Sequence, residues 1–162
     1  MRIGAFATRR AFLAGAAQAG AALLLPSAWA AEGLPRMTVT RDPSCGCCRG
    51  WVAHVKEAGF PVEVLEATDL GPLKARLGVP PALISCHTAE VGGYVLEGHV
   101  PAEAIVRLIA ERPEARGLAV PGMPVGSPGM EVTGMAPEPY EVVLFGPGPQ
   151  RVFARYHGTQ AI

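Results

Sequence analysis

The chain has 162 residues, enough for one modest domain, and its 49% share of hydrophobic residues is sufficient to form a core. Its 14 basic and 14 acidic side chains leave no net charge, which argues against a nucleic-acid-binding protein that works by neutralising phosphates. Aromatic residues make up only 6% of the chain, too few to suggest a platform for stacking single-stranded bases. We therefore expect a single domain with no nucleic-acid partner.

The first 30 residues have the composition of a signal peptide. The arginine pair at positions 9 and 10 precedes a Phe-Leu dipeptide, and the uncharged run of residues 14–30 ends in Ala28-Trp29-Ala30, a small-x-small cleavage signal. The arginine pair resembles a twin-arginine (Tat) signal, which predicts export to the periplasm. A membrane span is disfavoured because Gln18 and Pro26 interrupt a weakly hydrophobic run.

Residues 31–162 are predicted to form the mature protein, a single domain without a membrane span. The removed segment contains three arginines and no acidic residue, so the mature chain would carry a net charge of −3. All four cysteines remain in it, and the predicted compartment is oxidising.

The first predicted elements alternate between strand and helix. Residues 37–40 are β-prone, and residues 45–58 repeat apolar positions at helical spacing behind Ser44, a good N-cap residue. Residues 61–67 predict a second strand. Residues 70–77 predict a short helix, which Gly78 and the Pro80-Pro81 pair terminate.

A hairpin and a third helix follow. The two-residue turn Gly92-Gly93 predicts the hairpin, and Pro101 opens a helix with an apolar face that extends to Pro113. Residues 118–136 are dense in Gly, Pro and Met and predict a loop, after which residues 140–145 and 151–156 predict a last hairpin. The order β-α-β-α-β-β-α is that of a thioredoxin-like domain, so we expect an α/β fold with an added C-terminal loop and hairpin.

Three cysteines, Cys45, Cys47 and Cys48, lie between the first predicted strand and the first helix. Free N–H groups and the positive end of the helix dipole favour thiolates at this position. Cys45 and Cys48 have the Cys-x-x-Cys spacing of a redox pair, but Cys47 adds nothing to such a pair. Three thiolates within four residues indicate a site for a soft metal ion.

The fourth cysteine is placed by the register of the predicted hairpin. If Val91 pairs with Tyr94 across the turn, Cys86 lies opposite His99. In a thioredoxin-like topology the open end of this hairpin adjoins the first helix, so Cys86 and His99 should approach the other cysteines. The alternation puts both on one face with Thr88 and Glu97, and His87 on the opposite, core-facing side.

Methionines favour copper over zinc at such a site, because thioether sulfur is a soft donor. Met123 and Met130 lie in the Gly/Pro-rich loop, where their alternative role is to anchor the loop to the core. His87 is a candidate ligand or a core residue. His54 is expected to be a partly exposed helix residue, and His157 has no expected role.

Two other functions stay open at this point. Cys45 and Cys48 alone would suffice for a thiol–disulfide oxidoreductase. The four cysteines would also suit an exported module stabilised by two structural disulfides, although the adjacent pair Cys47-Cys48 makes such bridging awkward.

Several separated blocks of the chain match one known family: residues 42–48 with Trp51 and His54, residues 85–89, residues 93–101 and residues 121–131. Together they resemble the CopG-type family of exported bacterial copper-resistance proteins, formerly a domain of unknown function. The resemblance implies a thioredoxin-like fold, a periplasmic location and a cysteine-bridged multinuclear copper site. It places Cys45, Cys47, Cys48 and Cys86 as the bridging thiolates for Cu(I), and it implies Cu(I)/Cu(II) conversion as an activity. The expected partners are metal ions, and either copper carriers of the periplasm or a redox partner.

Overall fold

A computed structural model describes residues 33–162 of the chain. The predicted signal peptide, residues 1–30, lies outside the described residues and stays a prediction. Within the described part, none of the helices combines the length and the hydrophobicity needed to cross a bilayer.

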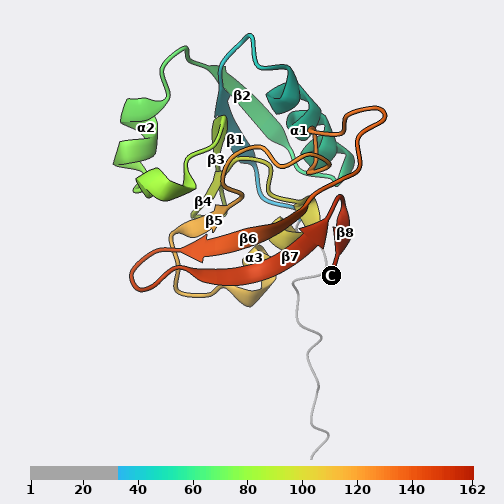
Figure 1. Ribbon diagram of the computed structural model, residues 1–162. Coiled ribbons are helices and arrows are strands. Elements are labelled where there is room, and N and C mark those ends of the chain that lie inside the picture. The colour runs from blue at the N-terminus through green and yellow to red at the C-terminus, as the bar shows by residue number, and fades with distance from the viewer. Residues whose placement is uncertain (1–32) are drawn as a thin grey trace, which may run out of the picture. The chain divides into compact units, whose positions relative to one another are not determined.

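The described chain is an α/β unit with a single extended sheet (Figure 1). Its elements follow the predicted order β-α-β-α-β-β-α and then continue with four more strands. In chain order they are β1 (Met37–Arg41), α1 (Gly46–Glu57), β2 (Val62–Glu66), α2 (Gly71–Arg76), a 3-10 turn (Pro81–Leu83), β3 (His87–Val91), β4 (Tyr94–Glu97), α3 (Ala102–Glu111), β5 (Gly117–Ala119), β6 (Pro139–Phe145), β7 (Arg151–His157) and β8 (Gln160–Ala161).

The eight strands lie in the order β2-β1-β3-β4-β5-β6-β7-β8. β1 is parallel to β2 and antiparallel to β3, and β4 is parallel to β5. The β3–β4 hairpin has the predicted register, with Val91 paired to Tyr94 and Thr88 paired to Glu97. The register between β1 and β3 pairs Arg41 with His87. Asp42, which follows Arg41, and Cys86, which precedes His87, therefore meet at one end of these two strands.

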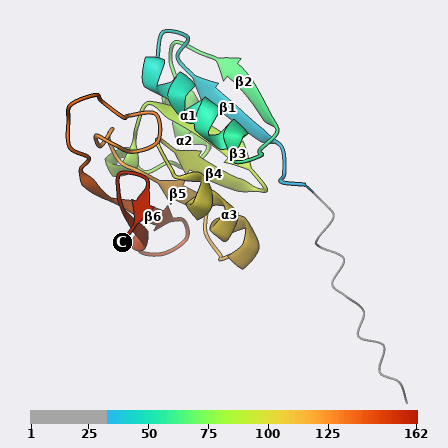
Figure 2. The same ribbon diagram turned by 90° about the vertical axis from the view of Figure 1, so that its right-hand side faces the viewer.

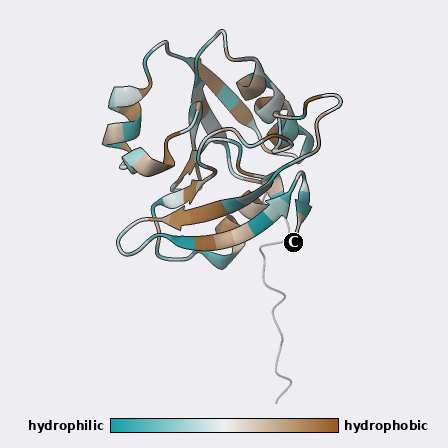
Figure 3. Cartoon of the chain, in the orientation of Figure 1, coloured by the Kyte–Doolittle hydropathy of each residue, from teal (hydrophilic) through white to brown (hydrophobic). Residues whose placement is uncertain are grey.

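Both faces of the sheet are covered. The larger apolar cluster joins α1 and α3 to one face through residues such as Trp51, Ile105 and Leu96. A smaller cluster on the other face joins the end of α2 to β4 and β6 through Leu77, Val95 and other residues. Accordingly, α1 lies in front of β1 and β3 in Figure 2 and α2 lies behind them. Most of β6 is coloured as hydrophobic in Figure 3, which matches its buried position.

The start of α1 differs from the prediction. Ser44 was expected to be the N-cap residue, but the helix begins one residue later, with Cys45 as its N-cap. Ser44 instead bonds to the side chain of Asp42, which accepts hydrogen bonds from both the backbone N–H (2.7 Å) and the hydroxyl of Ser44. This Asx turn uses the short polar side chain before the helix begins.

The C-terminal half also differs in two places. The predicted loop of residues 118–136 loses its first residues to β5, which inserts between β4 and β6. The predicted last hairpin is present as β6 and β7 with a bulge between Val142 and Val143, and the short strand β8 extends the sheet further. The loop proper therefore connects β5 to β6 and crosses toward α1, as Figure 1 shows.

Candidate metal centre

Three of the four cysteines lie at the start of α1. Cys45 and Cys48 form a disulfide with a Cα–Cα distance of 5.4 Å, and the sulfur of Cys45 also accepts a hydrogen bond from the backbone N–H of Cys48 at 3.3 Å. Cys47 is a free thiol, and its Sγ lies 3.4 Å from the Sγ of Cys45. The helix start thus holds one oxidised pair and one thiol in direct contact.

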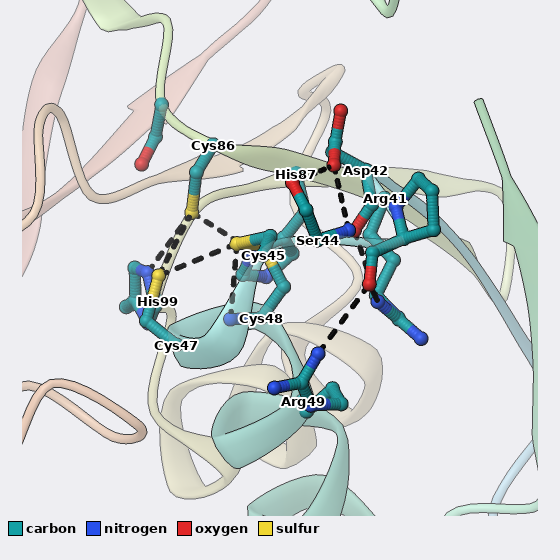
Figure 4. Close-up of a disulfide and its surroundings, with 12 residues drawn as sticks. Arg41, Asp42, Ser44, Cys45, Cys47, Cys48, Arg49, Cys86, His87 and His99 are labelled. Carbon is teal, nitrogen blue, oxygen red and sulfur yellow. Dashed lines mark hydrogen bonds between the residues drawn. A yellow bond between two sulfur atoms is a disulfide. The ribbon is translucent and has the colours of Figure 1, made fainter. Parts of the chain in front are cut away.

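The fourth sulfur comes from the segment that precedes β3. The Sγ of Cys86 lies 3.9 Å from the Sγ of Cys47, and the four sulfur atoms all lie within 4.8 Å of one another (Figure 4). The pairing of Arg41 with His87 explains this approach, because it brings Cys86 beside the connection from β1 to α1. The predicted convergence of Cys86 with the other three cysteines is confirmed.

Two imidazole rings lie against Cys86. The Nε2 of His99 is 3.1 Å from the Sγ of Cys86, and the Nδ1 of His87 is 3.3 Å from the same sulfur. The two rings are edge to face, with centroids 5.1 Å apart, and His87 also packs against Trp51 of α1 at 4.4 Å. Both histidines are fully buried.

The predicted face of Cys86 and His99 is wrong, because both lie on the side of His87 and α1, although their proximity to each other is confirmed. Strand alternation was expected to keep His99 on the face of Thr88 and Glu97, away from His87. Instead β4 ends at Glu97, and Gly98 has a positive φ of 72° that turns the chain. A side chain at Gly98 would lie about as close as 2.6 Å to the carbonyl oxygen of Val120, so only glycine fits this turn. The turn brings His99 to the side of His87 and α1.

Burial determines the protonation of these groups. Burial, together with the neighbouring Cys47, raises the pKa of Cys86 to about 12, so its thiol keeps its proton until a metal ion displaces it. Burial also lowers the pKa of His99, and it lowers the pKa of His87 well below the ordinary value, with His99 and Lys74 adding to the effect. Both imidazoles are therefore neutral at pH 7, the form in which histidine binds metal ions.

The loop between β5 and β6 reaches the site through its backbone. The carbonyl of Pro128 accepts a hydrogen bond from the Nδ1 of His99 at 2.8 Å, and Gly129 lies against Cys47 and Gly50 of α1. Met130 is partly buried, whereas Met123 is more than half exposed (52%). Contact of either methionine with a metal ion stays a prediction.

A buried ionic network supports Cys86 from the opposite face of the sheet. Lys74 of α2 donates to the carboxylate of Glu97 at 2.6 Å and to the hydroxyl of Thr88 at 2.9 Å. The same carboxylate accepts the backbone N–H of Ser85 at 2.7 Å. Glu97 therefore holds the residue next to Cys86 in place. The sequence predicted that Thr88 and Glu97 lie on the same face of the hairpin, but it did not identify Lys74 as their partner.

The remaining two histidines lie outside the cluster. The Nε2 of His54 accepts the backbone N–H of Ala102, at the start of α3. His157 is exposed at the end of β7. The predicted partial exposure of His54 is confirmed, and the absence of a metal-binding role for these two histidines stays a prediction.

The donor set suits a soft metal ion. Sulfur atoms prefer Cu(I) or zinc to hard ions, and imidazole also binds copper and zinc. The Nδ1 of His87 faces the sulfur of Cys86, whereas its Nε2 is fully buried and has no hydrogen-bond partner among the described residues. Four thiolates become available only when the Cys45–Cys48 disulfide is reduced. The alternative with two structural disulfides is not what the structure has, because Cys47 and Cys86 are both free.

Fold and site together define the class: an α/β protein with a cysteine and histidine cluster that fits the binding of copper or a similar soft ion. Two solved structures, "Copper resistance protein copG- Form 1" and "Copper resistance protein copG- Form 2", are similar to this chain, each with 45% sequence identity and a TM-score of 0.72. The match covers 78% of this chain and 100% of the first structure, and 77% and 99% for the second. The chain belongs to the CopG family of copper resistance proteins.

The comparison with family models gives a consistent result. A family described as "Protein of unknown function, DUF411" matches residues 83–130, the stretch that contains Cys86, both buried histidines and the first part of the β5–β6 loop. A search of curated proteins finds no match.

Proposed function

We propose that this protein is a periplasmic copper-binding protein of copper resistance that holds Cu(I) in a cysteine-bridged, multinuclear site. The observation that carries the proposal is the convergence of four sulfur atoms within 4.8 Å from two distant segments, the start of α1 and the start of β3. Thiolates of Cys45, Cys47, Cys48 and Cys86 would bridge more than one ion. The order of the first four strands also supports the interpretation of the fold as thioredoxin-like.

The disulfide makes the binding of Cu(I) dependent on reduction. Two electrons and two protons convert the Cys45–Cys48 disulfide into two thiols, and each Cu(I) ion then displaces thiol protons as it binds. The electrons come from a thiol reductant or from a protein redox partner. We propose export by the twin-arginine route and delivery of copper by periplasmic carriers, since the N-terminal pattern indicates that compartment.

We further propose that the protein converts copper between Cu(I) and Cu(II). A cluster at the protein surface could exchange electrons with a partner, and conversion to the less toxic or more readily exported ion would lower free copper. Cys45, Cys47 and Cys86 are all only partly buried, so electron transfer would not require the domain to open.

The proposal is tested by titrating the reduced mature protein with Cu(I) under anaerobic conditions against a competing chelator. We expect more than one copper ion per chain, and a loss of at least half of that copper in Cys47→Ser and in Cys86→Ser. Met123→Leu and Met130→Leu test the loop ligands, and Met135→Leu is the matched control because Met135 is an exposed methionine outside residues 121–131. A reduced protein that binds no copper would contradict the proposal.

A thiol–disulfide oxidoreductase is the second candidate. The observation that favours it is the closed Cys45–Cys48 disulfide at the start of a helix, the position in which such pairs are reactive. Insulin reduction by the wild-type protein and by Cys47→Ser separates the two functions. Turnover that does not change in Cys47→Ser would favour the oxidoreductase, whereas the four-sulfur copper cluster depends on Cys47.

A further inference from the structure

A second set of donors remains intact when the Cys45–Cys48 disulfide is closed. A sulfur in a disulfide carries no thiolate charge and is a poor ligand, so the oxidised protein loses two of the four sulfur donors. Cys86 is not part of the disulfide, and it forms a separate group of three potential ligands with His87 and His99. The oxidised state therefore exchanges a four-sulfur site for a site with one sulfur and two nitrogens.

The three donors already have the spacing of a metal site. Zinc-type bonds of about 2.0–2.3 Å at tetrahedral angles place ligand atoms about 3.5 Å apart. The Sγ of Cys86 lies 3.1 Å from the Nε2 of His99 and 3.3 Å from the Nδ1 of His87, and one ligand atom from each of the three residues lies within 4.8 Å of the others.

The tautomer of His99 is set for metal binding. The carbonyl of Pro128 can only accept a hydrogen bond, so the Nδ1 of His99, 2.8 Å away, carries the proton. The lone pair on Nε2 is then directed at Cys86. A hydrogen bond from the non-binding nitrogen to a carbonyl is the usual support of a metal-binding histidine. The loop between β5 and β6 thus orients His99 through its backbone.

His87 has no competing role for one of its nitrogens. It is fully buried, its ring is held by Trp51 at 4.4 Å, and its Nε2 has no hydrogen-bond partner among the described residues. A buried polar atom without a partner is unfavourable, and such atoms mark positions where an ion, a water molecule or a functional contact is to be expected. The Nδ1 of His87 faces the Sγ of Cys86 at 3.3 Å, so Nδ1 is the nitrogen placed to bind a metal ion.

From this geometry we infer that Cys86, His87 and His99 form a mixed sulfur–nitrogen site for one divalent transition-metal ion, complete while the Cys45–Cys48 disulfide is closed. One thiolate and two imidazoles suit Cu(II) and Zn(II), whereas a cluster of thiolates selects Cu(I). The inference shares Cys86 with the proposed copper cluster and extends that function: the redox state of the cysteine pair selects the oxidation state of the copper that is bound.

The test uses Cys47→Ser with the Cys45–Cys48 disulfide intact. In this variant Cys86 is the only free thiol, so no second thiol in the chain can reduce the added metal or form a further disulfide. Co(II) is the probe, because it does not oxidise thiols and its bonds to sulfur give a charge-transfer absorption. We expect one Co(II) per chain with that absorption, and at least a tenfold weaker affinity after adding His99→Ala.

Controls make the result specific to the three residues. His157→Ala, which removes an exposed histidine, should leave Co(II) binding unchanged. If His99→Ala fails to fold, proton resonances of imidazole rings shifted by Co(II) in the Cys47→Ser protein provide the same information, with two rings expected. Cu(II) should displace Co(II) at a lower concentration than Zn(II) does, following the general order of affinities.

Two outcomes overturn the inference: folded Cys47→Ser protein without a sulfur–cobalt absorption, or a spectrum without shifted imidazole resonances. The Cu(I) titration of the reduced wild-type protein is read separately. If that titration gives several ions per chain while Co(II) does not bind the oxidised variant, the mixed site is wrong and the cluster stands. If Co(II) binds but Cu(I) does not, the cluster is wrong and the mixed site stands.

Discussion

At the scale of single residues, His54 lies on α1 but stabilises the start of α3. Its position in the sequence does not indicate this contact. The N-cap of α3 is Pro101, which has no side-chain group to satisfy the first free N–H groups of the helix. The Nε2 of His54 accepts the N–H of Ala102 at 3.0 Å instead and so connects α1 to α3. This bond requires a neutral ring with its proton on Nδ1.

The stability contributed by His54 should depend on pH. Burial lowers the pKa of His54 below 6.5, although the carboxylates of Glu131, Glu57 and Glu103 oppose the shift. A folded-state pKa below the unfolded value means that the contribution is fully present above pH 6.5 and is lost as the pH falls from there through the folded-state pKa. We expect His54→Ala to lower the free energy of unfolding by about 0.5–2 kcal/mol at pH 8, the range for a lost cap, and by less at pH 5.

Urea unfolding of the wild-type protein and of His54→Ala at both pH values measures this difference. His157→Ala is the control, because its side chain is exposed. A destabilisation by His54→Ala that is the same at pH 8 and pH 5 would contradict the role of the neutral ring.

At the scale of elements, the packing of the β5–β6 loop on α1 depends on two glycines. The Cα of Gly129 approaches Gly50 so closely that a side chain at Gly50 would lie 2.9 Å from it. A side chain at Gly129 would lie 2.5 Å from the backbone nitrogen of Trp51 and 2.6 Å from the carbonyl oxygen of Cys47. Backbone atoms cannot move aside as a flexible side chain can, so the contact requires glycine.

Gly129→Ala is expected to lift the loop and to break the hydrogen bond between Pro128 and His99. The φ of 84° at Gly129 adds backbone strain, and together these effects should cost about 1–3 kcal/mol and weaken metal binding. Gly122→Ala is a matched control, since its φ of 69° is also positive but nothing lies within 4 Å of its added side chain. Thermal unfolding and Co(II) affinity compare the two variants. Equal effects of the two substitutions would show that the loop contact does not support the site.

At the scale of the whole molecule, the proposed function makes the disulfide and bound Cu(I) ions alternative stabilisers of the same region. The Cys45–Cys48 bond closes a very short loop, with a sequence separation of 3. Chain-entropy arguments give such a short cross-link about 2 kcal/mol of stabilisation. Metal ions that bind only the folded, reduced protein stabilise it by mass action, by about 2.7 kcal/mol when the free ion is at 100 times its Kd.

We therefore expect the free energy of unfolding to fall on reduction and to recover when Cu(I) is added. Urea unfolding of the oxidised, reduced and copper-loaded protein, all under anaerobic conditions, measures the three values. The double variant Cys45→Ser with Cys48→Ser should not respond to the reductant in the absence of copper. A reduced protein whose stability does not change with Cu(I) would mean that the ions do not bind at this structured site.

Much of the fold could be predicted because the sequence patterns that indicate its strands, helices and turns are local. Gly92-Gly93 determines the register of the β3–β4 hairpin, and this register places Cys86 near His99 without knowledge of any distant contact. Helical spacing behind residue 45 places three cysteines at a helix start. The side of the sheet on which His99 lies could not be predicted, because Gly98 ends the alternation of β4 through a conformation that periodicity does not encode.

The amino-acid sequence by itself determined the order of the elements from β1 to α3 and the soft-donor character of the candidate site, because both depend on residue types and on short spacings along the chain. Only the tertiary structure decided which groups surround the candidate site: the Pro128 carbonyl that orients His99, the Lys74–Glu97 pair behind Cys86, and the Nδ1 of His87 that faces Cys86. These contacts join residues from separate elements, and their geometry follows from how α1, α2 and the loop pack on the sheet. Packing is a property of the whole fold, so no short stretch of the chain contains it.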